Sequence, residues 1–329
     1  MKRVFKVLII IFAILIVAIT GLIGYVKTAL PDIAAAEDIK IDYTQERIAR
    51  GKYLANSVSM CIDCHSQRDY TKFAAPLIPG TEGKGGELFG KDLGFPGDFY
   101  APNITPAGIG TWTDGELLRA ITTGVSKDGH ALFPIMPYPN FGQLDKEDIY
   151  SIIAYIRTLK PIENVVPKSE AAFPVSILIN TMPQEATFAP IPSQQELIPY
   201  GKYIFTASSC TDCHTPMDKG ERLADKFAAG GFEFNLPDGT VVRSSNITPD
   251  KQTGIGAWTV KEFIARFKLY SDSTFVPHEV GPGEFKTVMP WTSYTLMEEI
   301  DLKALYAYLQ SIPAVNNKVV KFGQREKSE

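Results

Sequence analysis

The sequence is poor in cysteine and histidine, and its charges are almost balanced. It contains 4 cysteines and 4 histidines among 329 residues, and its formal net charge at pH 7 is −4. No basic stripe favours nucleic acid as a partner, and no long block of like charge marks a solvated tail. The composition therefore excludes a nucleic-acid-binding protein, and the small number of thiols means that each one needs a specific explanation.

All four cysteines lie in two copies of the motif Cys-x-x-Cys-His, at residues 61–65 and 210–214. In such a motif, two thiols can form thioethers to the vinyl groups of a haem, and the adjacent imidazole can bind the iron. Two copies that use every cysteine are a strong signal. We therefore predict two covalently attached haem c groups, held by Cys61, Cys64 and His65 and by Cys210, Cys213 and His214.

Three other uses of these cysteines fit less well. A structural zinc site could take four thiolates, but the two histidines would then have no role. A thioredoxin-like redox pair expects a preceding strand and a βαβ setting, which neither segment resembles. A disulfide within a Cys-x-x-Cys pair would do little to staple a fold. Covalent haem attachment is the favoured interpretation.

The amino terminus predicts a membrane anchor. Residues 7–26 carry no charge and are long enough to span a bilayer core as a helix. Lys2, Arg3 and Lys6 precede this run, which places the terminus inside and the rest of the chain outside. A cleaved signal peptide is the alternative, with Ala34-Ala35-Ala36 as its rather distant cleavage site. We favour a single-pass protein of the bacterial inner membrane with its haem motifs in the periplasm, where such motifs receive haem.

The haem motifs are centres of an internal duplication. Further segments occur twice, in the same order and at nearly constant separation: 51–53 and 201–203, 103–106 and 246–249, 108–113 and 254–259, 136–138 and 289–291, and 154–156 and 307–309. The repeat length is that of a domain rather than of a solenoid unit. The chain is therefore predicted to contain two tandem copies of one module.

Each module reads as mainly α-helical. A helix is expected over residues 45–57, and capping-box spacings start further helices at Thr113 and Thr259. The last helix of each module has an apolar face at helical spacing. Residues 79–97 read as loop. Between the modules, residues 161–199 are rich in proline yet contain an apolar stretch around Phe173. We expect this segment to pack across both modules, with an ordinary extended linker as the alternative.

The sixth ligand of each iron is predicted to be a methionine. Met136 and Met289 occupy equivalent positions late in the two modules, and each precedes a proline that would stiffen the ligand loop. His130 and His278 are the rivals, but they do not align with each other. A Met/His pair raises the reduction potential relative to two histidines. Trp112 and Trp258 are candidate donors to the haem propionates, and simple packing at a helix start is the alternative for both.

Taken together, these motifs resemble the multi-haem cytochrome c family, and most closely the cytochrome subunits of membrane-bound alcohol, gluconate and aldehyde dehydrogenases. The resemblance covers residues 41–313 and implies class I cytochrome c modules. It also implies that His65 and Met136 bind one iron, and that His214 and Met289 bind the other. Those subunits typically have three haem modules, whereas this chain has two and an amino-terminal anchor.

The resemblance implies an organisation and a function. The expected divisions are a membrane anchor and spacer at residues 1–36, a first cytochrome c domain at 37–160, a proline-rich segment at 161–199, a second cytochrome c domain at 200–315, and a tail at 316–329. The expected function is electron transfer without catalysis, from a periplasmic or membrane-bound dehydrogenase to a respiratory acceptor. A dihaem peroxidase is the alternative, and it would need an open iron site with an acid–base group beside it.

Overall fold

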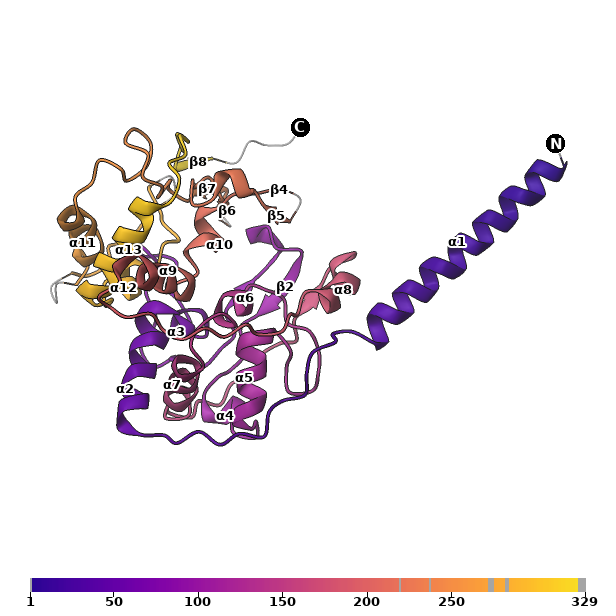
Figure 1. Ribbon diagram of the computed structural model, residues 1–329, viewed down its shortest axis with the longest axis horizontal. Coiled ribbons are helices and arrows are strands. Elements are labelled where there is room, and N and C mark those ends of the chain that lie inside the picture. Colours follow the sequence, from indigo (N-terminus) through magenta and orange to yellow (C-terminus); the bar gives the residue numbers. More distant parts are fainter. Residues whose placement is uncertain (1, 219, 237, 272–274, 282–283, 325–329) are drawn as a thin grey trace.

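A computed structural model describes residues 2–218, 220–236, 238–271, 275–281 and 284–324. Its first element is a long helix, α1 (Lys2–Thr28), which projects away from the rest of the protein (Figure 1). The part of α1 from Arg3 to Thr28 contains a window with a mean hydropathy of 3.1. Its length and composition are sufficient to cross a membrane, and a signal sequence near an N-terminus meets the same criteria.

The first half of the body is built from short helices. The helix expected over residues 45–57 is present as α2 (Gln45–Tyr53), which continues into a π-helical turn, η1 (Leu54–Val58). The chain then forms α3 (Cys61–Cys64), β1 (Leu88–Phe89), the 3-10 turn η2 (Lys91–Leu93), β2 (Gly97–Tyr100), α4 (Pro106–Ile109), α5 (Asp114–Thr123), α6 (Tyr138–Phe141) and α7 (Lys146–Ile156). The stretch expected to be loop, residues 79–97, holds only β1, η2 and the first residue of β2.

The second half repeats this order of helices, except that α4 has no counterpart among its described residues. It comprises α9 (Leu197–Ala207), α10 (Cys210–His214), β4 (Met217–Asp218), β5 (Glu221–Arg222), the 3-10 turn η4 (Ala224–Lys226), β6 (Glu233–Asn235), β7 (Thr240–Arg243), α11 (Val260–Lys268), α12 (Trp291–Tyr294) and α13 (Glu299–Ser311). A final strand, β8 (Phe322–Gln324), pairs antiparallel with β7. Part of the predicted tail at 316–329 is therefore the third strand of a small sheet.

In each half, the first helix crosses the last helix at a glycine. α2 packs against α7, and α9 packs against α13. A Cβ atom on Gly51 would lie 1.7 Å from the Ser151 carbonyl oxygen, and one on Gly201 would lie 1.9 Å from that of Ala304. Only glycine permits so close an approach between backbones. The recurring Gly-Lys-Tyr segment thus reflects one helix crossing that is used twice.

The predicted capping boxes are confirmed at both positions. The Thr113 hydroxyl accepts a bond from the Glu116 amide at 3.1 Å, and the Glu116 carboxylate accepts one from the Thr113 amide at 2.7 Å. The same pair of bonds joins Thr259 and Glu262 at the start of α11. Each box satisfies amides that a helix start leaves without partners. These local signals fix where α5 and α11 begin.

The apolar faces of both halves meet in one continuous core. Buried residues such as Leu54 and Ile153 from the first half and Ile204 and Leu305 from the second belong to a single hydrophobic cluster. The predicted apolar faces of α7 and α13 contribute to this cluster. The two halves are therefore joined by shared packing and not only by the connecting segment.

The connecting segment, residues 161–199, follows the first half more than the second. Its strand β3 (Glu170–Ala171) pairs with β2, and the amide of Thr187 donates to the Gly142 carbonyl at 2.7 Å. It also contains α8 (Val175–Leu178) and the 3-10 turn η3 (Ile179–Thr181). The expectation that its apolar side chains pack across both halves is wrong around Phe173, which is 81% exposed. This part of the segment lies against the first half instead, because β3 pairs with the edge of β2.

Candidate haem-binding site

Both Cys-x-x-Cys-His motifs form the same tight helical turn. Cys61 and Cys64 are the ends of α3, and Cys210 and Cys213 lie in α10. Residues three apart on a helical turn share one face, so both sulfurs of a pair can meet one flat ligand. The residue before each motif, Met60 or Ser209, has a φ of 50°, in the left-handed region. Such backbone strain outside glycine concentrates at functional sites.

A backbone carbonyl orients each imidazole. His65 Nδ1 lies 2.8 Å from the Pro102 carbonyl oxygen, and His214 Nδ1 lies 2.7 Å from that of Ser245. With the proton on Nδ1 as donor, Nε2 keeps a free lone pair. This is the arrangement in which a second group sets the tautomer of a metal-binding histidine. Paired thiols beside such an imidazole are a donor set that fits a covalently attached haem.

Burial favours the neutral forms of the histidines and cysteines in these motifs. Burial lowers the pKa of His65 and of His214, and the carbonyl contact raises it only in part. Burial also raises the pKa of the Cys61 and Cys64 thiols to about 12. At neutral pH the imidazoles are therefore uncharged, which is the form that coordinates iron.

The recurring Asn-Ile-Thr segment places these carbonyls. Asn103 Oδ1 accepts bonds from the amide and hydroxyl of Thr105 at 2.9 and 2.7 Å. Asn246 Oδ1 accepts the same two bonds from Thr248 at 2.9 and 2.8 Å. Side-chain bonds of this kind hold a turn. Because Pro102 and Ser245 immediately precede the two asparagines, the turn fixes the carbonyl that each histidine contacts. The two recurring segments therefore form the same turn.

A Gly-Gly pair lies near each histidine, and its role was not predicted from the sequence. The amides of Gly85 and Gly230 donate to the carbonyls of His65 and His214 at 2.7 and 2.8 Å. Both glycines have a φ near +70°. A Cβ at Gly85 would lie 2.5 Å from the Asn103 amide nitrogen, and one at Gly230 would lie 2.3 Å from the Ser245 carbonyl carbon. The recurrence of Gly-Gly at 85–86 and 230–231 was the available signal.

The two methionines predicted as sixth ligands occupy equivalent turns. The amide of Tyr138 donates to the Met136 carbonyl at 2.7 Å, and that of Trp291 donates to the Met289 carbonyl at 2.8 Å. Both methionine side chains are half-buried and pack against the core. The prolines that follow them have nearly the same backbone angles. Their coordination of iron stays a prediction.

The remaining predicted residues lie in less uniform surroundings. Trp112 is half-buried against the core, whereas Trp258 is 37% exposed. His130 is exposed, and its Nδ1 lies 2.5 Å from Asp128 Oδ1. The exposed His278 stacks on Phe73 with ring centroids 5.2 Å apart. The two rival histidines thus make unrelated local contacts, as their lack of alignment suggests.

Each methionine-loop helix contacts the opposite haem motif. Asn140 in α6 donates to both carboxylate oxygens of Asp212 at 3.2 Å. Ser293 in α12 donates to Asp63 Oδ1 at 3.2 Å. Asp63 and Asp212 are the third residues of their Cys-x-x-Cys-His motifs. The two motifs are therefore brought together across a reciprocal interface.

An arginine also faces each of these aspartates. Arg68 lies 3.3 Å from Asp63, and Arg222 lies 2.7 Å from Asp212. Burial raises the pKa of Asp212, while Arg222 and Asn140 act in the opposite direction. Tyr294 lies between the motifs, and its hydroxyl donates to the Ser208 carbonyl at 2.9 Å. Burial raises the pKa of Tyr294 well above its usual value, and groups of both motifs add to that effect.

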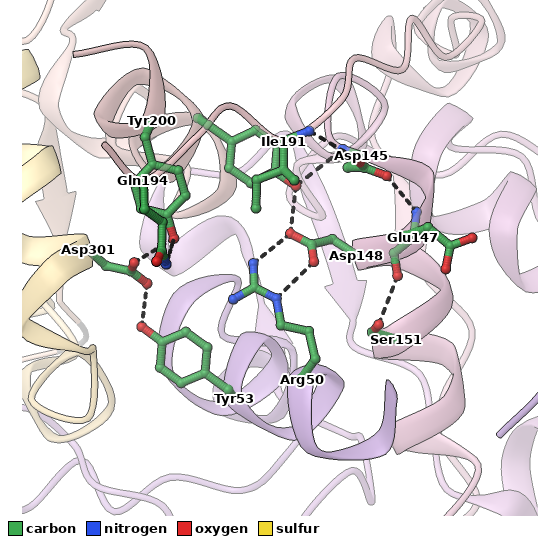
Figure 2. A network of polar contacts seen from close by, with 11 residues as sticks. Arg50, Tyr53, Asp145, Glu147, Asp148, Ser151, Ile191, Gln194, Tyr200 and Asp301 are labelled. Atoms are coloured by element: carbon green, nitrogen blue, oxygen red, sulfur yellow. Dashed lines mark hydrogen bonds and ion pairs between the residues drawn. The ribbon is translucent and has the colours of Figure 1, made fainter. Parts of the chain in front are cut away.

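A second set of reciprocal contacts joins the helix pairs (Figure 2). Tyr53 donates to Asp301 at 2.5 Å. Tyr203 donates to Asp148 at 2.6 Å. Asp148 also accepts two bonds from Arg50, at 2.9 and 2.8 Å, and Asp301 accepts one from Tyr200 at 2.6 Å. An interface in which residue pairs are exchanged in this way has approximate two-fold symmetry.

The alternative of a zinc site has no geometric support. Among the residues that the structure describes, no group of three or more His, Cys, Asp or Glu side chains is arranged to hold a metal ion. Although the two motifs are neighbours, their thiols do not form a tetrahedral cluster. The site is best described as two thiol–imidazole sets, one in each half.

Comparison with known proteins agrees with this description. The chain is 28% identical over 286 residues to the cytochrome c subunit of a quinone-dependent alcohol dehydrogenase from Gluconacetobacter polyoxogenes, covering 82% of this chain and 56% of that protein. It is 29% identical to the fructose dehydrogenase cytochrome subunit of Gluconobacter japonicus, covering 81% of this chain and 53% of that protein. No family model matches the chain.

A relative of more similar length is a dihaem c-type cytochrome from Cereibacter sphaeroides, which is 28% identical and covers 78% of this chain and 82% of that protein. By contrast, the chain spans little more than half the length of the dehydrogenase subunits. The resemblance to cytochrome c subunits of dehydrogenases is confirmed, and it supports electron transfer through haem c.

Proposed function

We propose that this protein is a membrane-anchored dihaem cytochrome c that relays single electrons from a dehydrogenase to quinone or a terminal oxidase. One observation carries the proposal: each half holds a Cys-x-x-Cys-His turn whose imidazole is oriented by a backbone carbonyl. The similarity to cytochrome subunits of dehydrogenases supports the choice of donor. The protein would act as a carrier, with catalysis belonging to the dehydrogenase.

Each half would bind one haem c through residues of its own. Cys61 and Cys64, or Cys210 and Cys213, would form the thioethers, and His65 or His214 would be the proximal ligand. Met136 and Met289 would complete the two coordination spheres, and the indoles of Trp112 and Trp258 would donate to propionates. Each bound haem supplies an iron that takes up and releases one electron. The half-buried Trp112 is better placed for its role than the exposed Trp258.

The halves would act as two cytochrome c domains, at residues 37–160 and 200–315, locked in one orientation. The bonds from Asn140 to Asp212 and from Ser293 to Asp63 tie each methionine loop to the opposite motif. The buried tyrosine–aspartate pairs add a second tie. A fixed orientation would keep the distance between the haems constant, so electrons could pass between them without domain motion. The helix α1 would hold both domains on the periplasmic side of the inner membrane.

The ligand assignment is tested by replacing one methionine at a time. In Met289→Ala, the second haem should lose its Met–iron charge-transfer band and its reduction potential should fall on the order of 0.1 V, because a thioether ligand raises the potential. The first haem should keep both properties. Met136→Ala should have the mirror effect. Magnetic circular dichroism and potentiometry of the full chain measure both.

Met217→Ala is the matched control, since Met217 lies on the exposed strand β4 and has no counterpart in the first half. This variant should leave both haems unchanged. If both potentials survive in Met289→Ala, the ligand assignment fails. A five-coordinate haem with rapid peroxide turnover in the unaltered protein would contradict the carrier function and favour the peroxidase.

A further inference from the structure

The segment around α8 touches α1 at one end of its apolar run. Asn180 Nδ2 donates to the Val26 carbonyl oxygen at 3.1 Å, and both α8 and η3 contact α1. Val26 is 8% exposed, whereas Leu22 one turn earlier is 63% exposed. Figure 1 shows α8 on the side of the body that faces α1. The contact therefore lies where the apolar helix meets the rest of the protein.

This segment presents apolar side chains to its surroundings. Phe173 is 81% exposed and Leu178 is 47% exposed. Residues 171–184 contain no charged side chain. An exposed apolar patch of this kind marks an interaction site more often than an isolated exposed residue does. Its composition fits an apolar partner rather than a charged one.

The position of α1 identifies that partner. An apolar run that reaches from residue 7 to Val26 matches the thickness of a bilayer core, so Val26 lies at the membrane surface. Tyr25, which is 58% exposed, and Lys27 are residue types that favour the interface between lipid and water. Because Asn180 of η3 bonds to Val26 and α8 also contacts α1, this arrangement would bring the exposed Phe173 and Leu178 to the level of the lipid headgroups.

The patch is rigidly connected to the first half. Glu170 and Ala171 pair with Asp98 and Gly97 of β2, and the Ala172 amide donates to the Pro96 carbonyl at 2.8 Å. A Cβ at Gly97 would lie 2.4 Å from the Glu170 carbonyl oxygen, so the two chains are in close contact. Whatever holds Phe173 therefore also restrains the first half.

We propose that residues 173–179 insert into the outer surface of the lipid bilayer beside α1 and form a second point of membrane attachment. An aromatic and aliphatic segment without charge is suited to the boundary between headgroups and acyl chains. Two attachment points restrict rotation of the body about α1 and hold the haem sites in one orientation to the membrane. The proposal rests on the membrane anchoring stated above.

Photo-crosslinking tests the contact directly. The full chain carrying p-benzoylphenylalanine in place of Phe173 is reconstituted in nanodiscs of phosphatidylethanolamine and phosphatidylglycerol, and adducts are identified by mass spectrometry. The same amino acid in place of Leu269 is the control. Leu269 is 61% exposed and follows α11, on the side of the body away from α1 (Figure 1). Lipid adducts severalfold more abundant at position 173 than at 269 are expected.

Equal lipid adducts at both positions, or adducts to protein alone at position 173, would overturn the proposal. Intact-mass measurement must show that the membrane-bound protein retains α1. A membrane-bound protein without α1 would also overturn the proposal. Haem content and optical reduction are measured on the same sample. Normal haem with no lipid adduct removes the second attachment point and leaves the proposed function standing. Lipid adducts at position 173 in a protein without two redox-active haems would support the second attachment point and contradict the proposed function.

A double variant, Phe173→Glu with Leu178→Glu, tests the consequence. Electron paramagnetic resonance of oriented membrane multilayers reports the angle of each haem to the bilayer. The angular dependence seen for the unaltered protein should weaken in the double variant, while haem content and potentials stay unchanged. Leu269→Glu should retain the full angular dependence. An unchanged dependence in the double variant would show that α1 alone sets the orientation.

Discussion

The two halves use the same backbone contacts around the imidazole but different side chains around the buried aspartates. His65 and His214 both meet a carbonyl that precedes an asparagine turn. In contrast, Asp148 is bound by an arginine and a tyrosine, whereas Asp301 is bound by two tyrosines.

The difference separates two kinds of constraint. A histidine that binds iron, as we propose for His65 and His214, must point in one direction, and here each one contacts a backbone carbonyl, which is present whatever the side chain at that position. A buried carboxylate needs only enough donors to satisfy its oxygens, and different side chains can supply them. Duplicated modules can therefore diverge at their interface while they keep the same ligand geometry.

The largest loss of stability is expected at the two helix crossings, where the halves are most alike. Gly51→Ala and Gly201→Ala each place a methyl group against a backbone carbonyl that cannot rotate away. Each should lower the free energy of unfolding by about 3 kcal/mol. Because the buried side chains form one cluster, both variants should shift a single calorimetric transition.

Gly323→Ala is the control for that experiment, since the nearest atom to a Cβ there is 3.9 Å away. It should leave the transition unchanged. Two transitions, with only one of them shifted by each glycine variant, would mean that the halves unfold independently in spite of their shared core.

The aspartates should distinguish the halves. Asp148→Ala leaves the charge of Arg50 and the hydroxyl of Tyr203 without their partner, and should cost about 3 kcal/mol, with partial exposure of Arg50 limiting the loss. Asp301→Ala leaves two neutral hydroxyls and should cost about 2 kcal/mol. Urea unfolding measures both. The reverse order would show that the charge of Arg50 is fully solvated.

The reciprocal tyrosines should behave alike. Tyr53→Phe and Tyr203→Phe each remove one bond to a carboxylate of the opposite half, and each should cost about 1.5 kcal/mol. Tyr43→Phe is the comparison within one half, because Tyr43 donates to Asp114 at 2.7 Å and is 42% exposed. It should cost less. Unequal losses at Tyr53 and Tyr203 would contradict the two-fold symmetry of the interface.

The smallest effect is expected at the helix caps. Thr113→Ala and Thr259→Ala each remove one bond to a helix amide and should cost about 1 kcal/mol. Thr113→Ser and Thr259→Ser retain the hydroxyl and should restore most of the stability in the same urea titration. A loss in the serine variants as large as in the alanine variants would assign the effect to the lost methyl group.

The features that were predictable are those encoded by neighbouring residues. The capping boxes at Thr113 and Thr259 act over three residues, so their spacing was enough to predict them, and the Asn-Ile-Thr turns act over two residues within segments whose recurrence was visible in the sequence. The Gly-Gly pairs at 85–86 and 230–231 carried the same kind of signal and were overlooked. Their purpose becomes visible only when Gly85 is seen to contact the carbonyl of His65.

The contacts between the halves had no comparable signal. Tyr53 and Asp301 are far apart in the chain, and neither residue type announces a partner at such a distance. The prediction that residues 161–199 pack across both halves was also wrong around Phe173, which is exposed. Apolar composition shows that a side chain avoids water, but it does not show whether protein or lipid covers it.

The two thiol–imidazole sets, the duplication and the apolar helix could be predicted from the amino-acid sequence, because each depends on residue type and spacing along the chain. Only the folded chain shows which carbonyl orients each histidine, which carboxylate each tyrosine contacts, and that the two motifs face one another. It also places α8, which follows the exposed Phe173, in contact with α1. The physical reason is that hydrogen bonds and packing act over a few ångströms in space, whatever the distance along the chain.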